Sequence, residues 1–290
     1  MYNTKPSHLI RQRHSCRTYQ RFPLSDPDLS ALKTFANRYA VGPFGHQSRF
    51  RVLPASDYDP GTLPRLGTYG FIKNPAAFIL GAISNQSGAL EDFGYSMELL
   101  VLKATDLGIG SCWLGGTFTK SRFARQMDLL PDELFPAVTA LGYPSNQISW
   151  LDRTVRIFAG ADHRLPWDRL FFSNTWEEPL PENQAGDYLL PLQLLRLGPS
   201  ASNKQPWRVL KESVNWHFFL ERNPNYPPPV FGQLLDVADL QRIDMGIAMA
   251  HFQLGLEEAG LEGKWISISQ DIDTQGTDRE YIISWQPNQG

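Results

Sequence analysis

The stretch Glu91–Gly116, EDFGYSMELLVLKATDLGIGSCWLGG, decides the fold of this chain. Apolar residues recur in its first part at steps of three and four, the period of one helix face. They are Phe93, Met97, Leu100, Val101, Ala104 and Leu107. We expect the helix to end near Gly108, because a Gly-Ile-Gly turn follows the periodic run. Cys112-Trp113-Leu114 then leads into Gly115-Gly116, where a backbone without side chains can approach a flat ligand closely.

The pattern returns 152 positions later, in DLQRIDMGIAMAHFQLGLEEAGLEGKW at Asp239–Trp265. Four residues coincide without a gap: Gly94 with Gly246, Met97 with Met249, Gly108 with Gly260, and Trp113 with Trp265. A second pair of landmarks follows the same order, because GPFGHQ at 42–47 resembles GPSASN at 198–203 and each leads into Arg-Val-Leu. We interpret these as two diverged copies of one unit. Chance similarity between two amphipathic helices is the alternative.

Length and composition are those of an ordinary globular protein. A chain of 290 residues can form one large domain or two ordinary ones, and its net charge of -3 gives no reason to expect nucleic acid or a membrane as partner. No apolar run is long enough to span a bilayer, and no apolar signal core is apparent. Cys16 and Cys112 are too few for a disulfide framework or a structural zinc site, so we expect a cytoplasmic, reduced protein without a metal.

The predicted elements mix helices, hairpins and strands without strict βαβ alternation, which favours the α+β class. The main ones are a buried strand at Ala77–Ile83, a short helix from Pro131, a strand at Phe135–Gly142, a helix at Leu189–Leu197, a hairpin over Trp207–Leu220, a helix near Val237–Gly260 and two final strands. A polar, proline-containing segment at Ser173–Asp187 is predicted to separate the copies. The first copy then covers residues 1–172 and the second, shorter copy covers residues 173–290.

The sequence lacks the local signatures of several enzyme classes. Gly108–Cys112 does not have the Gly-X-Ser-X-Gly spacing of a nucleophile elbow, and we interpret Cys112 as a structural thiol. There is no zincin histidine pair, no Walker A sequence and no G-x-G-x-x-G. What remains is a basic cluster around Ser15, whose fork-shaped cations and hydroxyl suit a phosphate. A solvated basic helix end is the alternative for these residues.

Several motifs resemble those of the FMN-dependent nitroreductase family. RHSCR at 13–17 resembles its Arg-x-Ser-x-Arg/Lys opening, and PSASNKQPW at 199–207 is similar to its Pro-Ser-x-x-Asn-x-Gln-Pro-Trp signature. LGIGSCWLGG at 107–116 resembles its flavin-contacting segment. LGYP at 141–144 and RLP at 164–166 resemble its closing elements. The two-copy layout resembles the TM nitroreductase subgroup.

The resemblance implies an α+β fold with mixed or antiparallel sheets flanked by helices, in which two nitroreductase-like copies are fused as an intramolecular pseudo-dimer. Family members are homodimers that bind each FMN at the interface, where the partner contributes the Pro-Ser-x-x-Asn stretch. Here the slot after the Arg-x-Ser opening holds Gly42–Gln47, which lacks the Ser and Asn, whereas the second copy has the intact version. We therefore expect a monomer with one FMN per chain, between the copies.

Matched by position, the resemblance also implies the contacts of the cofactor. The phosphate would be held by Arg13, Ser15, Arg17 and Arg164, with His14 in the same cluster. The Gly115 N–H would face flavin N5, with Trp113, Leu114 and Gly116 along the ring. Pro199, Ser200, Ala201 and Asn203 would close the site from the second copy.

The implied function is oxidoreduction: NAD(P)H reduces FMN by hydride transfer, and the flavin then reduces a nitroaromatic, quinone or similar small-molecule acceptor in the same pocket. One alternative is a degenerate relative that binds FMN or another small ligand without turnover, since the second copy has no Arg-x-Ser-x-Arg. Another is a structural relative that binds no flavin.

Overall fold

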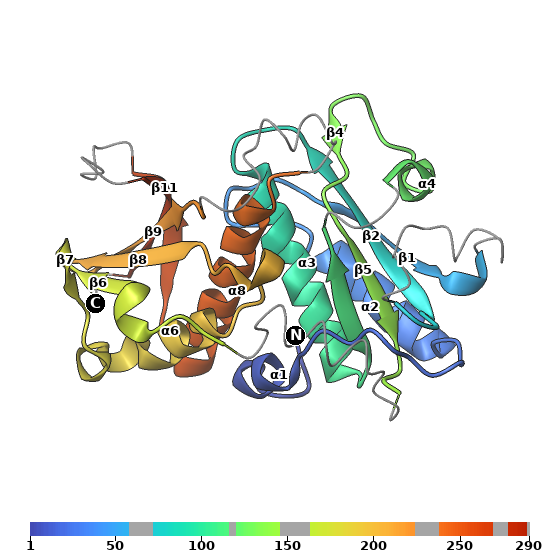
Figure 1. Cartoon of the computed structure of the whole chain (residues 1–290), viewed down its shortest axis with the longest axis horizontal. Helices are drawn as coiled ribbons and strands as arrows, with labels where there is room; N and C mark the ends of the chain where they lie inside the picture. The colour runs from blue at the N-terminus through green and yellow to red at the C-terminus, as the bar shows by residue number, and fades with distance from the viewer. Residues whose placement is uncertain (58–71, 116–119, 146–162, 224–237, 269–277, 289–290) are drawn as a thin grey trace.

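The computed structural model describes residues 1–57, 72–115, 120–145, 163–223, 238–268 and 278–288. Two sheets lie on either side of a pair of long helices (Figure 1). The α-helices are α1 (Pro6–Gln12), α2 (Asp26–Arg38), α3 (Ala89–Asp106), α4 (Lys120–Arg125), α6 (Leu189–Arg196) and α8 (Leu240–Ala259). The strands are β1 (Arg49–Pro54), β2 (Ala77–Ser84), β3 (Gly110–Leu114), β4 (Glu133–Leu134), β5 (Val138–Gly142), β6 (Phe171–Ser173), β7 (Thr175–Pro179), β8 (Trp207–Glu212), β9 (Asn215–Glu221), β10 (Gly263–Ile266) and β11 (Arg279–Pro287).

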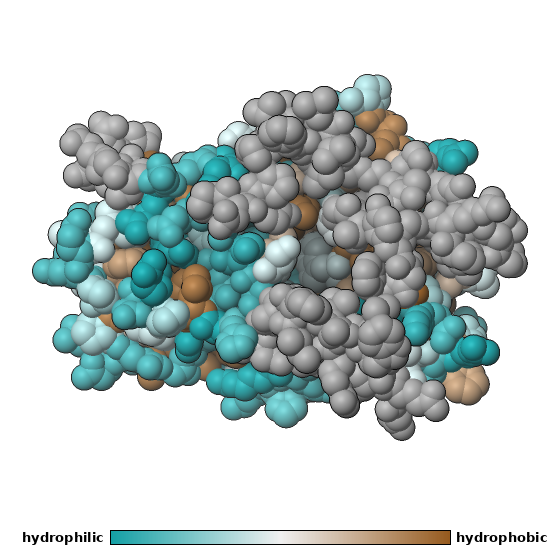
Figure 2. Space-filling model, in the orientation of Figure 1, coloured by the Kyte–Doolittle hydropathy of each residue, from teal (hydrophilic) through white to brown (hydrophobic). Residues whose placement is uncertain are grey.

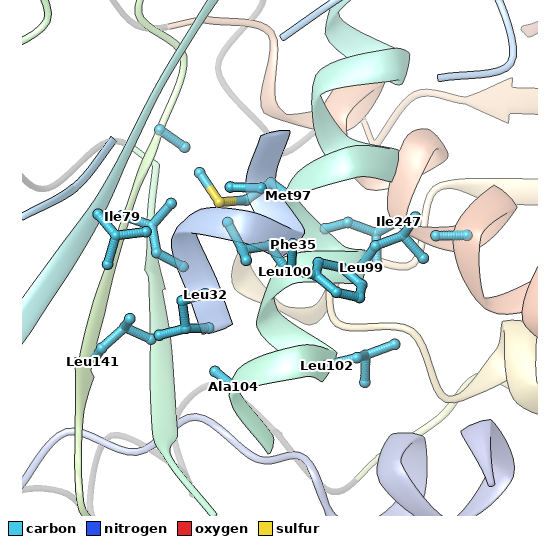
Figure 3. Close-up of a cluster of buried hydrophobic side chains, with 14 of the residues drawn as sticks. Leu32, Phe35, Ile79, Met97, Leu99, Leu100, Leu102, Ala104, Leu141 and Ile247 are labelled. Atoms are coloured by element: carbon cyan, nitrogen blue, oxygen red, sulfur yellow. The ribbon is translucent and has the colours of Figure 1, made fainter. Parts of the chain in front are cut away.

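The first sheet has the order β1-β2-β5-β3, with β4 pairing beside β2, and all of these pairs are antiparallel. The prediction of a buried strand at 77–83 is confirmed, because β2 has a hydrophobic core on each face. Ile79 and Ile83 face the core that holds α2 and α3, whereas Phe78 and Leu80 face a second cluster. Figure 3 shows side chains of α2 and α3 meeting those of the sheet and of α8 in the first of these cores.

The second sheet has the order β10-β11-β9-β8-β6-β7, in which only the β6–β8 pair is parallel among the described strands. The predicted hairpin is confirmed as β8 and β9. The two sheets and their helices confirm the α+β class. The prediction of a short helix from Pro131 is wrong, because residues 133–134 form β4 and their backbone pairs with β2. The predicted boundary at 172/173 stays a prediction, although it falls within β6, a strand of the second sheet.

We call residues up to 145 the first half and residues from 163 the second half. The contact between the halves centres on α3 and α8, which cross at two glycines. A Cβ added to Gly94 would lie 2.1 Å from the carbonyl oxygen of Ile243, and one added to Gly246 would lie 1.8 Å from that of Glu91. Both pairs are related by the same shift of 152 positions, so the contact is reciprocal. Only glycine allows these two backbones to approach so closely.

The ends of α3 and α8 repeat the same geometry. Gly108 and Gly260 follow them with φ of +73° and +70°. Ile109 N donates to Ala104 O at 2.8 Å, and Leu261 N donates to Leu256 O at 2.9 Å, as in a Schellman motif. The helix end predicted near Gly108 is therefore confirmed, and its counterpart lies 152 positions later.

Each long helix also carries a buried aspartate that binds a turn of its own half. Asp92 of α3 accepts hydrogen bonds from Phe44 N at 2.9 Å and His46 N at 2.8 Å. Asp244 of α8, again 152 positions later, accepts from Ala201 N at 3.0 and 3.1 Å. Burial raises the pKa of Asp92 to about 6, and it raises the pKa of Asp244 well above the usual range.

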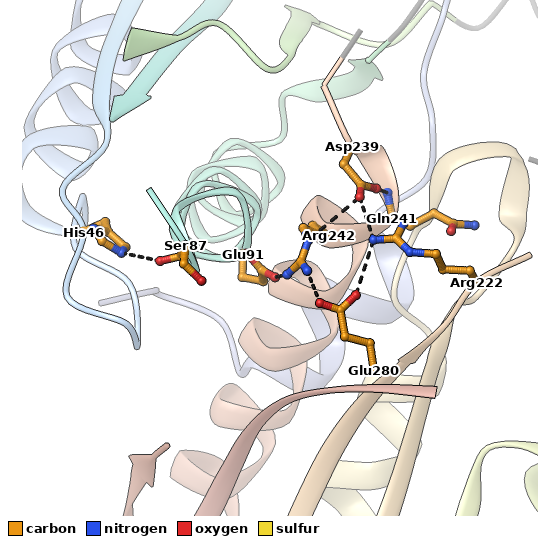
Figure 4. Close-up of polar contacts among 8 residues, drawn as sticks. All are labelled: His46, Ser87, Glu91, Arg222, Asp239, Gln241, Arg242 and Glu280. Atoms are coloured by element: carbon orange, nitrogen blue, oxygen red, sulfur yellow. Dashed lines mark hydrogen bonds and ion pairs between the residues drawn. The ribbon is translucent and has the colours of Figure 1, made fainter. Parts of the chain in front are cut away.

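A charged cluster lies beside the helix crossing (Figure 4). Arg242 of α8 contacts Glu91 of α3 at 2.5 Å and also contacts Glu280 of β11. Arg222 contacts Asp239 at 2.9 Å and Glu280 at 3.4 Å. Arg242 thus joins the first half to the second sheet. Glu91 is 1% exposed, and its burial raises its pKa although the nearby Arg242 charge opposes that shift.

Hydrophilic side chains predominate over the second half on the face shown in Figure 2. None of the described helices combines the length and the apolar character that crossing a membrane requires.

We predict that Gly246→Ala strongly destabilises the fold. Alanine favours a helix by about 1 kcal/mol over glycine. The added methyl group would meet a backbone carbonyl, which no rotamer change can relieve, so we expect a loss at the upper end of the usual overpacking cost of about 1–3 kcal/mol. Urea unfolding measures this loss in the free energy of unfolding. The control Glu257→Ala, at an exposed position of the same helix, should change stability by less than about 0.5 kcal/mol. A Gly246→Ala protein as stable as this control would contradict the close contact.

We also predict a pH dependence of stability that depends on Asp92. Its folded pKa of about 6 exceeds the ordinary 3.8, so between these values the folded state holds a proton that the unfolded state has released. Stability from this group is therefore complete below about pH 4 and is lost as the pH rises to 6, by about 2–3 kcal/mol in total. Denaturant unfolding of wild type and Asp92→Asn across this range measures it. Between pH 4 and 6, wild type should lose more stability than Asp92→Asn by this amount. An equal loss of stability in the two proteins would contradict the assignment.

Candidate functional site

A cavity of about 780 Å³ opens where the two halves meet. The first half contributes the end of α1, the segment that follows it and the end of β3, and the second half contributes Arg164, residues 197–203 and the start of α8. This volume is within the range of about 300–1,000 Å³ typical of small-molecule sites. The lining residues are Ile10, Arg11, Gln12, Arg13, His14, Ser15, Arg17, Cys112, Trp113, Gly115, Ala137, Arg164, Leu197, Pro199, Ser200, Ala201, Ser202, Asn203, Leu240, Ile243, Asp244 and Ile247.

The basic segment, residues 13–17, is held against β3. Helix α1 ends at Gln12, and Cys16 N then donates to Ser111 O at 2.8 Å. Ser15 pairs with Ser111 as an isolated parallel bridge. This attachment fixes the backbone of the segment, so that the predicted phosphate residues of the first half, Arg13, His14, Ser15 and Arg17, all line the cavity.

Arg13 is buried at the cavity wall. Its side chain is 7% exposed, and its Nε lies 3.8 Å from Glu98 Oε1, beyond hydrogen-bond distance. Among the described residues no acceptor partners this Nε. A buried guanidinium N–H without an acceptor costs free energy, because it has lost its water.

Glu98 also orients Trp113. The Trp113 Nε1 donates to Glu98 Oε2 at 2.9 Å, and His251 Nε2 lies 3.1 Å from Glu98 Oε1. His251 Nδ1 lies 2.9 Å from Leu194 O, which can only accept, so Nδ1 carries a hydrogen. His251 of α8 thus lies at the contact with α3.

The flavin-contacting segment predicted at 113–116 is divided by the structure. Trp113 and Gly115 line the cavity, and a Cβ added to Gly115 would lie 2.8 Å from side-chain atoms of Leu240 in the second half. The structure does not bring Leu114 to the cavity with them: it is not a lining residue, and its side chain packs in the core on the far face of the first sheet. Strand alternation between Trp113 and Leu114 is the reason. Gly116 lies outside the described residues.

The closing turn, residues 198–205, presents Pro199, Ser200, Ala201 and Asn203 to the cavity. Ser202, Asn203 and Gln205 have φ of 50°, 54° and 49°, although none is glycine. Such conformations cost about 1–3 kcal/mol each and tend to occur at functional sites. Two hydrogen bonds hold the turn. Gln205 N donates to Ser200 Oγ within it at 2.9 Å, and Ala201 N donates to Asp244 of α8.

Arg164 binds to this turn. It donates to Asn203 Oδ1 at 3.2 Å and to Leu197 O at 3.3 Å, and Asn203 Nδ2 donates to His163 O at 2.8 Å. The structure therefore brings Arg164 and Asn203, which the sequence separates by 39 residues, to one wall of the cavity.

The described lining is strongly positive. It contains four arginines, Arg11, Arg13, Arg17 and Arg164, and a single acidic residue, Asp244. An anionic ligand is therefore favoured. Among the described residues no cluster of His, Cys, Asp or Glu could hold a metal ion. Leu240, Ile243 and Ile247 of α8 form an apolar wall.

Sequence reasoning missed Asp244, Glu98 and this apolar wall. All of them lie on the long helices. Polar residues in a helical pattern are ordinarily assigned to the solvent side, which is why Asp244 and Glu98 were missed. The echo between the two helices was the available signal, because it aligns Asp244 with Asp92.

Comparison with known proteins gives a consistent result. The family described as "Putative TM nitroreductase" matches residues 7–256. A solved structure of a putative nitroreductase from Thermotoga maritima MSB8 covers 100% of this chain and 96% of its own, with 17% identity and a TM-score of 0.60.

Structures of smaller nitroreductases match about half of the chain. One from Desulfitobacterium hafniense DCB-2 with bound FMN is 20% identical and covers 50% of this chain and 92% of its own, with a TM-score of 0.40. One from Desulfovibrio desulfuricans in complex with FMN is 22% identical and covers 52% and 95%, also with a TM-score of 0.40. No curated protein matches the chain.

The family match covers most of the chain, and the full-length structural match has the same two-sheet α+β fold. The chain belongs to the TM nitroreductase family.

Proposed function

We propose that this chain is an FMN-dependent oxidoreductase of nitroreductase type. It takes a hydride from NAD(P)H and passes it to a nitroaromatic, a quinone or a similar small acceptor. The observation that carries the proposal is the buried Arg13 guanidinium at the cavity wall, whose Nε has no acceptor among the described residues.

The residues fit FMN in two respects. A phosphate would supply the acceptor that Arg13 lacks, and Ser15, Arg17 and Arg164 line the same cavity as further donors. Gly115 offers a backbone N–H without a side chain, so a ring can approach it. A Cβ at this position would lie 2.8 Å from the Leu240 side chain, so Leu240 lies close beside this residue.

FMN, when bound, supplies the hydride chemistry, and the protein supplies position and exclusion of water. Arg13, Ser15, Arg17 and Arg164 would hold the phosphate, and Gly115 N–H would contact N5. Trp113, fixed by Glu98, and the apolar wall of α8 would enclose the ring and keep water out. Pro199, Ser200, Ala201 and Asn203 would close the site.

We further propose that the chain is an intramolecular pseudo-dimer that acts as a cytoplasmic monomer with one such site. The reciprocal contacts of Gly94 and Gly246, and the matched helix ends, support two copies of one unit. The first half contributes the phosphate residues, and the second half contributes the turn that a partner subunit would contribute in a homodimer.

The alternative is a protein that binds FMN or another small ligand without turnover. It is favoured by the position of Leu240 close to Gly115, because this side chain occupies space beside the residue proposed to contact the ring.

Anaerobic addition of NADH or NADPH to the FMN-loaded protein separates the two readings. If the protein is an enzyme, we expect the visible flavin absorbance to fall on mixing with the nucleotide and to return when a quinone is added. A flavin that stays oxidised in the presence of either nucleotide would leave the binding protein as the correct description.

We predict that Arg13→Ala lowers FMN affinity through the phosphate. Hydrogen bonds to charged groups contribute about 1.5–3 kcal/mol, so FMN affinity should fall by about tenfold or more. Riboflavin, which lacks the phosphate, should lose much less. Fluorescence titrations of both ligands measure this, with Arg38→Ala, exposed at the end of α2, as the control. Equal losses for FMN and riboflavin would contradict the phosphate assignment.

A further inference from the structure

Asp244 is the one acidic residue among the described residues that line the cavity, and the proposed function does not use it. It lies on α8 next to Ile243 of the apolar wall, and it is 3% exposed. Burying a carboxyl in an apolar wall costs free energy unless the carboxyl is paired, so the position of Asp244 requires a physical explanation.

The first half contains a residue equivalent to Asp244, with which it can be compared. Asp92 occupies the equivalent place on α3, binds the equivalent turn and does not line the cavity. Its two oxygens accept from two different amides, Phe44 N and His46 N. Both oxygens of Asp244 share the single N–H of Ala201. By the match of the two turns, Phe44 and His46 correspond to Ser200 and Ser202, whereas the amide that Asp244 receives is that of Ala201, the counterpart of Gly45.

The groups around Asp244 determine whether its carboxyl is protonated. Among the described residues no Lys, Arg or His forms an ion pair with it, and the charged group that acts on it is Asp239, which has the same sign. Burial therefore raises the pKa of Asp244 well above the usual range, and the neutral acid is favoured. Ala201 N is itself a donor, so it cannot accept from the carboxyl O–H. Among the described residues no acceptor is recorded for that O–H.

We propose that Asp244 contacts the ligand of this cavity directly and donates a hydrogen bond from its carboxyl O–H to a carbonyl oxygen or ring nitrogen of a planar ligand. The inference rests on the proposed function, in which that ligand is FMN. The second half then contributes a ligand contact from its long helix in addition to the closing turn. Asp92, with both oxygens occupied by amides, keeps only the structural role.

The first test is the affinity of the full chain for FMN, titrated by fluorescence. Asp244→Asn keeps an oxygen for Ala201 N and an N–H for the ligand, so its affinity should stay within about threefold of wild type. Asp244→Ala loses both, and the loss of one ligand hydrogen bond should weaken binding by about fivefold to tenfold. The matched control Asp92→Ala removes the equivalent carboxyl outside the cavity and should leave the affinity unchanged. Thermal melts establish that each variant is folded.

The second test is the infrared difference spectrum between the FMN-bound and the free protein. We expect a C=O stretch of a protonated carboxyl that shifts when FMN binds and is missing in Asp244→Asn. This readout does not depend on Asp244→Ala being folded.

The outcomes separate the two proposals. If wild type binds no FMN, the proposed function fails and this inference fails with it. If wild type binds FMN but Asp244→Ala binds it equally well, or the infrared difference is the same in Asp244→Asn, only the role of Asp244 is overturned.

Discussion

The close backbone contact between α3 and α8 is the constraint on which the rest of this structure depends. Each helix places a glycine against a backbone carbonyl of the other, at 1.8 and 2.1 Å from where a Cβ would lie. A side chain at either position would separate the helices. Their separation would move the α8 wall away from Trp113 and Gly115, and the cavity between the halves would lose its shape. The geometry of the site is therefore set by two residues that do not line it.

The same crossing explains the mixture of charge and burial around the cavity. Helix α3 brings Glu98 beneath Trp113 and Arg13. Its Oε2 accepts from Trp113, and its Oε1 lies near both Arg13 and His251 of α8. The second half therefore contributes, through His251, a contact to the carboxylate that orients Trp113 of the first half. Arg242, which contacts Glu91, reinforces the contact at one side. This network joins Trp113 of the cavity wall to α8 through Glu98 and His251, so it ties the position of that wall to the packing of the halves.

Much of this architecture could be predicted from local pattern. The period of Phe93 to Leu107, the apolar run at 77–83 and the hairpin around Val214 report their own burial, because each element buries a face that its sequence displays. Residues 131–134 could not be assigned in this way: Pro-Asp-Glu is a typical helix start, and pairing with β2 overrides it. The match by position groups Leu114 with Trp113, whereas strand alternation turns the Leu114 side chain away from the cavity into the opposite core. Glu98 contacts His251, 153 residues away, and Asp244 contacts Ala201, 43 residues away, and no single-segment pattern reports either contact.

The central claim is that one site is built from both halves of a single chain. The most direct test is the FMN content of the loaded protein, measured by absorbance against protein concentration, together with its mass in solution. The account predicts one FMN per chain in a monomer. Two FMN per chain, or flavin bound only by a dimer of chains, would contradict it.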